Sequence, residues 1–235
     1  MLPLLAVQVN AASELEENQL FKAVYKGKLS GFKVTLTRTL THNDDNAYTL
    51  DSIARNGFAS ISEKSTFLNV ENYFVPTGYD YKRSILGNKS KQKITFDWAN
   101  HKAYYRREDK PSRNTDHDIA VGILDPSLYQ LKLQQDLFEQ KESLTYDYIK
   151  LTRIDSMNFV FNKESTFELN GKQLKATQYK RLREDSKKQT FVTLIPSLAY
   201  QIAKITHVNE DGKAYTLELK GFNYDKERLE AFYKH

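Results

Sequence analysis

The chain has 235 residues, a length that all-β domains often reach undivided, and it can bury a sizeable core without cross-links. It contains no Cys, which excludes disulfides, thiolate metal sites and Cys nucleophiles, and we expect no lipid-anchor Cys. The net charge is +5, with Lys and Arg spread along the chain rather than gathered on one face. We therefore expect no nucleic-acid partner.

The N-terminal segment has the pattern of a secretory signal peptide. Leu2 to Val9 is apolar and uncharged, small residues precede a cut after Ala11, and acidic residues follow at once. We therefore expect a signal peptide at 1–11, one β-rich domain at 12–235 and a periplasmic location. No Lys or Arg precedes the apolar run, which leaves a buried N-terminal strand of a cytosolic protein as the alternative. No segment is long enough to predict an integral membrane protein.

Alternation of apolar and polar residues is the clearest signal in the rest of the chain. Phe32, Val34 and Leu36 alternate with Lys and Thr residues, as in a strand with one buried face. Similar strand-like patterns occupy 94–98, 144–151, 157–161, 165–169, 174–177, 191–195 and 215–219. Turn signals separate these runs at Lys26–Lys28, Asn43–Asn46, Gly87–Asn88, Asn100–His101, Asn170–Gly171 and Asp211–Gly212.

The spacing of these strands indicates how they pair. Short connections favour antiparallel neighbours in a meander and leave no room for the helical crossovers of a parallel sheet. Asn170–Gly171 is the strongest two-residue hairpin signal. We predict a mainly β fold in which one large antiparallel meander sheet curls into a partial or closed barrel.

One segment has the composition of an α-helix. Asp125 can cap it, Pro126 suits its first turn, and 126–139 has good helix formers without β-branched residues. Its apolar residues form two stripes on nearly opposite sides: Tyr129, Leu133 and Leu137 on one, Leu128, Leu131 and Phe138 on the other. We expect this single helix to be contacted on two sides, packed against the sheet as a plug or lid.

The many aromatic residues have two interpretations. They fill the core of the sheet, or they line an apolar cavity that the helix partly plugs. The residues expected to line such a cavity or core are Phe96, Trp98, Leu128, Leu131, Phe159 and Phe161.

No pattern indicates a specific chemistry. Asp116-His117-Asp118 is the densest set of ligand-type residues, but neighbours in sequence point apart and the polar stretch 109–118 is typical of an exposed loop. Asp97 and His101 could form a general-base pair, yet no nucleophile motif accompanies them. We therefore assign no catalytic residue, no metal ligand and no cofactor.

Several motifs occur together along most of the predicted mature chain. They are Tyr25-Lys26-Gly27, the strand Thr95–Trp98, the segment Leu124–Leu131, Asn170-Gly171 and Ile195-Pro196. In this combination the chain resembles a family of bacterial exported proteins, domain of unknown function 3108; Leu124–Leu131 is the most specific piece. The resemblance implies a periplasmic β-rich fold similar in outline to the curved sheets of lipoprotein carriers. It implies no catalytic residues.

Three functions follow as hypotheses. The first is a non-catalytic binding protein of the cell envelope that shelters an apolar or amphipathic ligand, such as a lipid, in the curved sheet. The second is a module that contacts an envelope protein or cell-wall polymer during envelope assembly. The third is a hydrolase that uses Asp97, His101 or the segment 116–118. The oligomeric state stays open.

Overall fold

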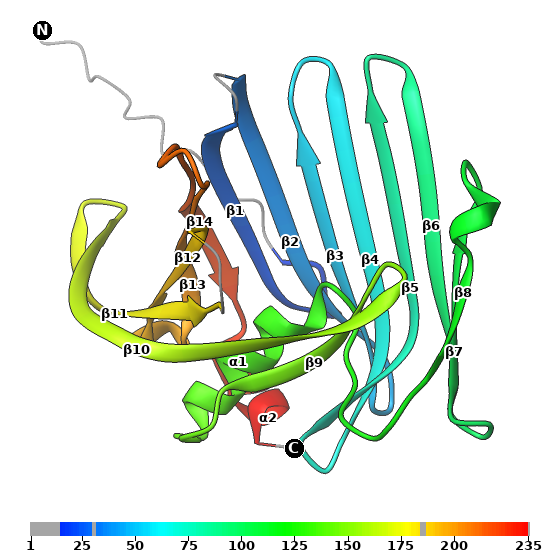
Figure 1. Cartoon of the computed structure of the whole chain (residues 1–235). Helices are drawn as coiled ribbons and strands as arrows, with labels where there is room; N and C mark the ends of the chain where they lie inside the picture. The colour runs from blue at the N-terminus through cyan, green and yellow to red at the C-terminus, as the bar shows by residue number, and fades with distance from the viewer. Residues whose placement is uncertain (1–14, 30–31, 184–186, 235) are drawn as a thin grey trace, which may run out of the picture.

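The computed structural model describes residues 15–29, 32–183 and 187–234, so the expected signal peptide at 1–11 lies outside the described residues. One sheet of 14 strands dominates them (Figure 1). Its first half comprises β1 Gln19–Leu29, β2 Phe32–Asp44, β3 Ala47–Arg55, β4 Ala59–Val70, β5 Tyr73–Ile85, β6 Asn88–Asp97, β7 Lys102–Arg107 and β8 Thr115–Asp118. Its second half comprises β9 Thr145–Lys150, β10 Arg153–Leu169, β11 Lys172–Leu182, β12 Gln189–Ile195, β13 Gln201–Val208 and β14 Ala214–Tyr224.

The strand order confirms the antiparallel meander. The sheet runs β8-β7-β6-β5-β4-β3-β2-β1-β14-β13-β12-β11-β10-β9, and every ladder in it is antiparallel. The sheet is curled but its main ladder does not close, because β8 and β9 remain edge strands. Leu124 bridges part of this gap: its amide donates to Asp147 O at 2.9 Å, and its carbonyl accepts from the amide of Ile149 at 3.0 Å.

The turn predictions are confirmed at one prominent site and wrong at another. Asn170 and Gly171 have φ of 51° and 77° between β10 and β11, the left-handed backbone that a two-residue hairpin requires. Gly27, by contrast, lies inside β1 rather than in a turn. A Cβ at this position would come within 2.0 Å of the carbonyl oxygen of Thr216 on β14, so glycine here permits a close approach of two strands.

The predicted helix is present as α1, Leu128–Phe138, which begins two residues later and ends one residue earlier than expected. Asp125 explains the later start. Its Oδ1 accepts the amides of Ser127 at 2.8 Å and Leu128 at 3.1 Å, which holds Pro126 in a turn before the first helical residue. The hydroxyl of Ser65 donates to the same oxygen at 2.9 Å, so this cap also fastens the helix to β4.

The two apolar stripes of α1 reflect a helix enclosed by the curled sheet. Leu128, Leu131, Leu133 and Leu137 are all buried in the main core. Polar side chains of α1 also reach neighbouring elements: Gln134 Nε2 donates to Gln201 Oε1 on β13 at 3.2 Å. The helix therefore fills the interior of the sheet as a plug, with strands of the curled sheet on both sides.

A second helix, α2 Lys226–Tyr233, corrects the expectation of a single helix. Asp225 caps it by accepting the amide of Arg228 at 3.1 Å. Phe232 of this helix packs against Tyr48 and Phe74, with ring centroids 4.7 Å and 5.5 Å away. The signal was present in the sequence, because an Asp precedes apolar residues at 229, 232 and 233, a spacing that suits one helical face.

The helices give the curled sheet two different ends (Figure 1). At the closed end, α2 lies beside the turns that join β2 to β3 and β4 to β5, and Asn69 Nδ2 donates to Phe232 O at 2.7 Å. At the open end are the last residues of β1, the start of β2, and the turns that join β3 to β4 and β5 to β6. Among the described residues, the helices are too short or too polar to cross a membrane.

Candidate functional site

A cavity of about 250 Å³ lies between α1 and the second half of the sheet, and we call it the inner cavity. Its walls combine aromatic, aliphatic and basic side chains from five elements. They are Tyr129, Gln130, Met157, Phe159, Arg181, Arg183, Thr190, Val192, Ile205 and His207. Strand pairing places Ile205 opposite Leu217 and Leu217 opposite Gly27, so the cavity lies toward the open end of β1.

Strand alternation brings these side chains to one face. Tyr179 of β11 lies against the core, so the period of two also directs Arg181 inward, and Arg183, the residue directly after the strand, lines the same cavity. Phe159 pairs with Arg181 across β10 and β11, and its ring stacks on Tyr129 of α1 with centroids 6.4 Å apart. The cavity is therefore aromatic on its helix side and basic on its β11 side.

The lining of the inner cavity has two guanidinium groups and no carboxylate. Arg181 Nη2 donates to Ser156 O at 3.3 Å, and Arg183 Nη2 donates to Thr190 Oγ1 at 3.2 Å. The Nε atoms of both arginines are buried without a hydrogen-bond partner among the described residues. Burial and the positive charge of Arg181 lower the pKa of Arg183. This wall of the cavity is therefore suited to an anion.

Thr190 forms hydrogen bonds with both Arg183 and His207. Thr190 Oγ1 and His207 Nδ1 are 3.0 Å apart. Burial, together with the positive charges of Arg183 and Lys188, lowers the pKa of His207. The imidazole is therefore neutral near pH 7. Because Thr190 Oγ1 accepts from Arg183, the hydroxyl hydrogen of Thr190 is left to donate to the neutral His207. These two hydrogen bonds orient the guanidinium of Arg183.

A third arginine increases the positive charge of the interior. Arg38 on β2 is buried, and its Nη1 donates to Gln130 Oε1 at 2.8 Å; Gln130 lines the inner cavity. Within the described part of the chain, Arg38 forms no salt bridge. Glu63, two strands away, instead accepts the hydroxyl of Tyr79 at 2.6 Å. A buried cation without a counter-ion is costly, so an anionic ligand nearby would be stabilised.

A second hollow adjoins the inner cavity through Arg181 and Arg183, and we call it the basic groove. It has a volume of about 710 Å³ and is lined by Thr145, Lys150, Arg153, Asp155, Ser156, Asn158, Arg181, Leu182 and Arg183. Lys150 and Arg153 approach Asp155 at 2.9 Å and 3.6 Å, and this pairing lowers the pKa of the Asp155 carboxyl. Four cations thus face one carboxylate. The two hollows therefore share Arg181 and Arg183, with aromatic and aliphatic residues on one side and mainly basic residues on the other.

The residues predicted to line a cavity or core separate into several places. Phe159 lines the inner cavity, while Leu128 and Leu131 of α1 are buried in the main core. Phe96 stacks on Trp98 in a separate cluster at the other half of the sheet, where Trp98 Nε1 donates to Pro76 O at 2.7 Å.

Phe161 differs from the expectation. Phe161 is 55% exposed, and its ring packs edge to face against Tyr179. Phe161 follows the alternation of β10, but an inward direction buries a side chain only where another element covers that face of the sheet.

The residues considered for catalysis are engaged elsewhere. Residues 115–118 form edge strand β8 rather than a loop, so Asp116 and Asp118 point to one face and His117 to the other. Asp116 pairs with Arg106, and Asp118 with Lys102, each at 2.6 Å. His117 Nε2 lies 3.2 Å from Leu151 O.

The second candidate pair also has structural partners. The carboxylate of Asp97 accepts hydrogen bonds from the backbone amide of Asn100 at 3.2 Å and from Asn100 Nδ2 at 2.8 Å. His101 occupies the turn that follows. The described residues contain no cluster of three or more side chains that could hold a metal ion.

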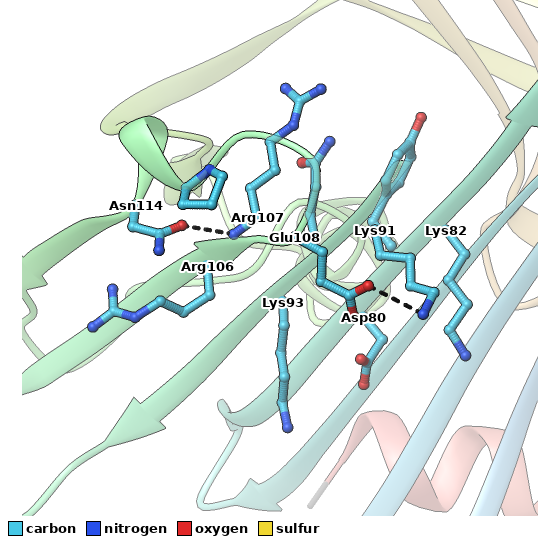
Figure 2. A pocket seen from close by; sticks show the side chains of 11 residues that line it. Asp80, Lys82, Lys91, Lys93, Arg106, Arg107, Glu108 and Asn114 are labelled. Atoms are coloured by element: carbon cyan, nitrogen blue, oxygen red, sulfur yellow. Dashed lines mark hydrogen bonds and ion pairs between the residues drawn. The ribbon is translucent and has the colours of Figure 1, made fainter. Parts of the chain in front are cut away.

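Figure 2 shows a further hollow, of about 560 Å³, on the outer face of β5, β6 and β7. Cross-strand pairs place Lys82 beside Lys91, and Asp80 beside Lys93, on this face. Glu108 binds Lys91 at 3.1 Å. The lining has five cations and two carboxylates. Helix α1 and the aromatic core lie on the opposite side of the sheet, so this hollow lacks the apolar wall of the inner cavity.

Sequence reasoning missed the basic residues of the inner cavity. Lys180, Arg181 and Arg183 belong to the Lys and Arg residues that are spread along the chain, and charged residues usually face water. The usable signal was the alternation from Tyr179, which assigns 181 and 183 to the inner face of the strand and 180 to the outer face.

Comparison with known proteins supports the fold and the family. The crystal structure of a β-barrel-like protein of domain of unknown function DUF1849 from Brucella abortus is similar, with a TM-score of 0.52 and 10% sequence identity over 88% of this chain and 98% of that one. No curated protein matches the sequence. The family model described as "Protein of unknown function (DUF3108)" matches residues 21–195. The chain therefore belongs to the DUF3108 family.

Proposed function

We propose that this protein is a non-catalytic binding protein of the bacterial cell envelope that shelters an amphipathic, anionic ligand inside its curled sheet. The observation that carries the proposal is the inner cavity, an aromatic-lined space whose only charged wall consists of Arg181 and Arg183. Apolar pockets with a few convergent polar groups are the usual form of small-molecule sites.

The two hollows suit the two ends of such a ligand. At about 250 Å³ the inner cavity is smaller than the roughly 300–1,000 Å³ of common ligand sites, so it accommodates one end of a molecule. An apolar tail fits against Phe159, Val192 and Ile205. An acidic head group fits the basic groove, where arginine and lysine side chains provide charge-assisted hydrogen bonds. Arg181 and Arg183 stand at the boundary of the two.

The envelope location rests on the sequence at 1–11, whose apolar run and small residues have the pattern of an export signal. Expression of the full chain with an epitope tag, followed by fractionation, tests it. A periplasmic, shortened product is expected. A full-length cytosolic product would contradict this part of the proposal.

Ligand binding is tested with a defined probe. The purified protein is delipidated and titrated with dansyl-labelled undecanoic acid, and its methyl ester serves as the uncharged probe. We expect the acid to bind with enhanced dansyl fluorescence and the ester to bind at least about tenfold more weakly, because one charge-assisted contact is lost. Native mass spectrometry after gentle extraction searches in parallel for a co-purified ligand.

Matched variants on one strand make the test specific. Arg181→Ala/Arg183→Ala removes the inward cations at the end of β11, whereas Lys172→Ala/Lys180→Ala removes two cations from the other face of the same strand. The first pair of changes should abolish the preference for the acid, and the second should keep it. Equal affinity of acid and ester for the wild-type protein, or equal losses in both double variants, would refute an anion site in the cavity.

The alternative of a protein- or polymer-interaction module finds less support at the sheet edges. Strand β8 has only four residues, and Leu124 already occupies part of the β9 edge. Short or covered edges resist the addition of another strand.

A further inference from the structure

Exposed apolar residues gather at the open end of the sheet. Phe32 begins β2, Phe58 lies between β3 and β4, and Leu86 lies between β5 and β6; their exposed fractions are 50%, 52% and 80%. Ile85, beside Leu86, is also exposed. Figure 1 shows the β3–β4 and β5–β6 hairpin ends projecting at the top of the molecule. Polar residues usually occupy such turns, so large apolar side chains here need a reason.

Direct contacts join these residues into one patch. The rings of Phe32 and Phe58 meet edge to face with centroids 5.0 Å apart. The amide of Leu86 donates to Phe58 O at 3.1 Å. Asn56 Oδ1 accepts the amides of Phe58 at 3.0 Å and Ala59 at 2.7 Å, which fixes the backbone that holds Phe58 outward. We call Phe32, Phe58, Ile85 and Leu86 the apolar tip.

The parts of the strands nearest the apolar tip carry basic residues without acidic ones. The sequence at 26–35, 53–62 and 82–92 has eight basic residues and no Asp or Glu: Lys26, Lys28, Lys33, Arg55, Lys82, Arg83, Lys89 and Lys91. Lys91 pairs with Glu108 of a neighbouring loop, but in the described part of the chain Lys28, Lys33 and Lys89 form no salt bridge. On β5 to β7 the basic face continues into the hollow of Figure 2.

We propose that the apolar tip and its surrounding cations dock the open end of the sheet onto the surface of an anionic lipid bilayer. Aromatic and aliphatic side chains of the tip enter the interfacial layer, and the Lys and Arg residues on the strands behind them contact acidic head groups. This arrangement presents the inner cavity, which lies toward the same end, to the bilayer.

The size and shape of the patch favour a bilayer over a protein partner. Four apolar side chains are far fewer than the about 20–30 residues on each side of a stable protein interface. They also project from turn ends instead of forming a groove that a partner segment could fill. A bilayer requires no complementary shape, only apolar area and positive charge, and both are present.

Vesicle flotation tests the proposal with the purified protein. We expect the wild-type protein to float with vesicles of phosphatidylcholine and phosphatidylglycerol at 3:1 and to remain below pure phosphatidylcholine vesicles. Phe32→Ser/Phe58→Ser/Leu86→Ser should lower the partition coefficient at least about tenfold through lost apolar insertion. Lys28→Glu/Lys33→Glu/Lys89→Glu should lower it at least as much, and 0.5 M salt should mimic that loss.

Matched controls separate a defined surface from general charge. Lys163→Glu/Lys172→Glu/Lys175→Glu reverses three exposed cations at or near the β10–β11 hairpin, and Val121→Ser/Phe161→Ser removes two exposed apolar side chains elsewhere. Both controls should change partitioning less than about threefold. The proposal is overturned if the wild-type protein does not float with anionic vesicles, which leaves the tip to a protein partner, or if the controls lose as much as the tip variants.

Fluorescence quenching measures insertion directly, because Trp98 is the sole Trp of the chain. In a Trp98→Phe background, Phe58→Trp places the probe in the apolar tip and Phe161→Trp places it on β10. Brominated lipids should quench the first probe and leave the second unchanged; equal quenching of both would contradict insertion of the tip.

The outcome is independent of ligand binding. Tip variants should bind dansyl-labelled undecanoic acid in solution as the wild-type protein does, because none of their residues lines the inner cavity. Loss of flotation with intact probe binding is the expected pattern. Loss of both activities in a variant with native circular dichroism would overturn the assignment of the tip as a separate surface.

Discussion

The two ends of the curled sheet differ in which polar and apolar groups they bury and which they expose. At the closed end, Phe232 is buried among aromatic rings, and the capping residue Asp125 is enclosed with hydrogen bonds to Ser127, Leu128 and Ser65. At the open end, arginines face a cavity without carboxylates, and Phe58 faces solvent. One end is organised for stability, whereas the other departs from the rules of a stable core, as functional sites commonly do.

The helices account for this difference. Side chains on the inner face of a sheet are buried only where another element covers them, and α1 and α2 cover the half nearer the turns between β2 and β3 and between β4 and β5. The comparison predicts that changes at the closed end alter the free energy of unfolding, while changes at the open end alter binding.

The largest expected effect is at the closed end. Phe232→Ala should lower the free energy of unfolding by about 3–5 kcal/mol, because it removes a buried ring that contacts Tyr48, Phe67 and Phe74. Urea unfolding followed by circular dichroism measures it. A loss under about 1 kcal/mol would show that α2 is not part of the cooperative core.

The second effect concerns pH. Burial raises the pKa of Asp125 to about 7, so the folded state holds a proton that the unfolded chain releases near pH 4. Its contribution to stability is therefore fully present below about pH 4 and is lost as pH rises through about 7. At about 1.4 kcal/mol for each tenfold change in the protonation equilibrium, the loss reaches up to roughly 4 kcal/mol.

Asp125→Asn should flatten the dependence of the unfolding free energy on pH between 4 and 7. Asp155→Asn is the control at the open end. Its carboxyl has a lowered pKa through Lys150, so its contribution is lost only as pH falls below its ordinary range. Unfolding curves across this pH range that keep the wild-type slope in Asp125→Asn would contradict the assignment.

A smaller effect is expected inside the open end. Arg183→Ala should change the free energy of unfolding by less than about 1 kcal/mol, or raise it slightly, because the change relieves repulsion from Arg181. Binding of the acidic probe should still weaken. A stability loss comparable with that of Phe232→Ala would mean that the arginines serve the fold and not a ligand.

The smallest effect is expected at the apolar tip. Phe58→Ser should leave the free energy of unfolding within about 0.5 kcal/mol of the wild-type value, because the exposed ring contributes little burial. The same urea series measures it beside Phe232→Ala. A larger loss would assign the tip a structural role.

Much of the fold was predictable because its signals are local. The alternation in 32–36 and the Asn170–Gly171 turn indicate antiparallel strands and hairpins from neighbouring residues alone, and the two apolar stripes of α1 indicate a helix contacted on more than one side. The strand limits, the place of Gly27 inside β1 and the pairing of β1 with β14 depend on contacts between distant segments.

The candidate site was less predictable, because a period of two states that two residues share a face but not what covers that face. Phe159 and Phe161 alternate identically, yet one lines the inner cavity and the other is exposed. Arg181 and Arg183 share the same uncertainty, and sequence statistics place charged residues in water.

The sequence by itself determined the β-rich class, the antiparallel hairpins, the enclosed helix and the family, since each rests on local pattern or motif. Only the tertiary structure decided that the sheet curls without closing its ladder and that a second helix seals one end. It also decided that cations meet aromatic rings inside the other end. The physical reason is that burial, charge balance and cavity shape are properties of residues far apart in the chain, which meet only when the sheet has curled around its helices.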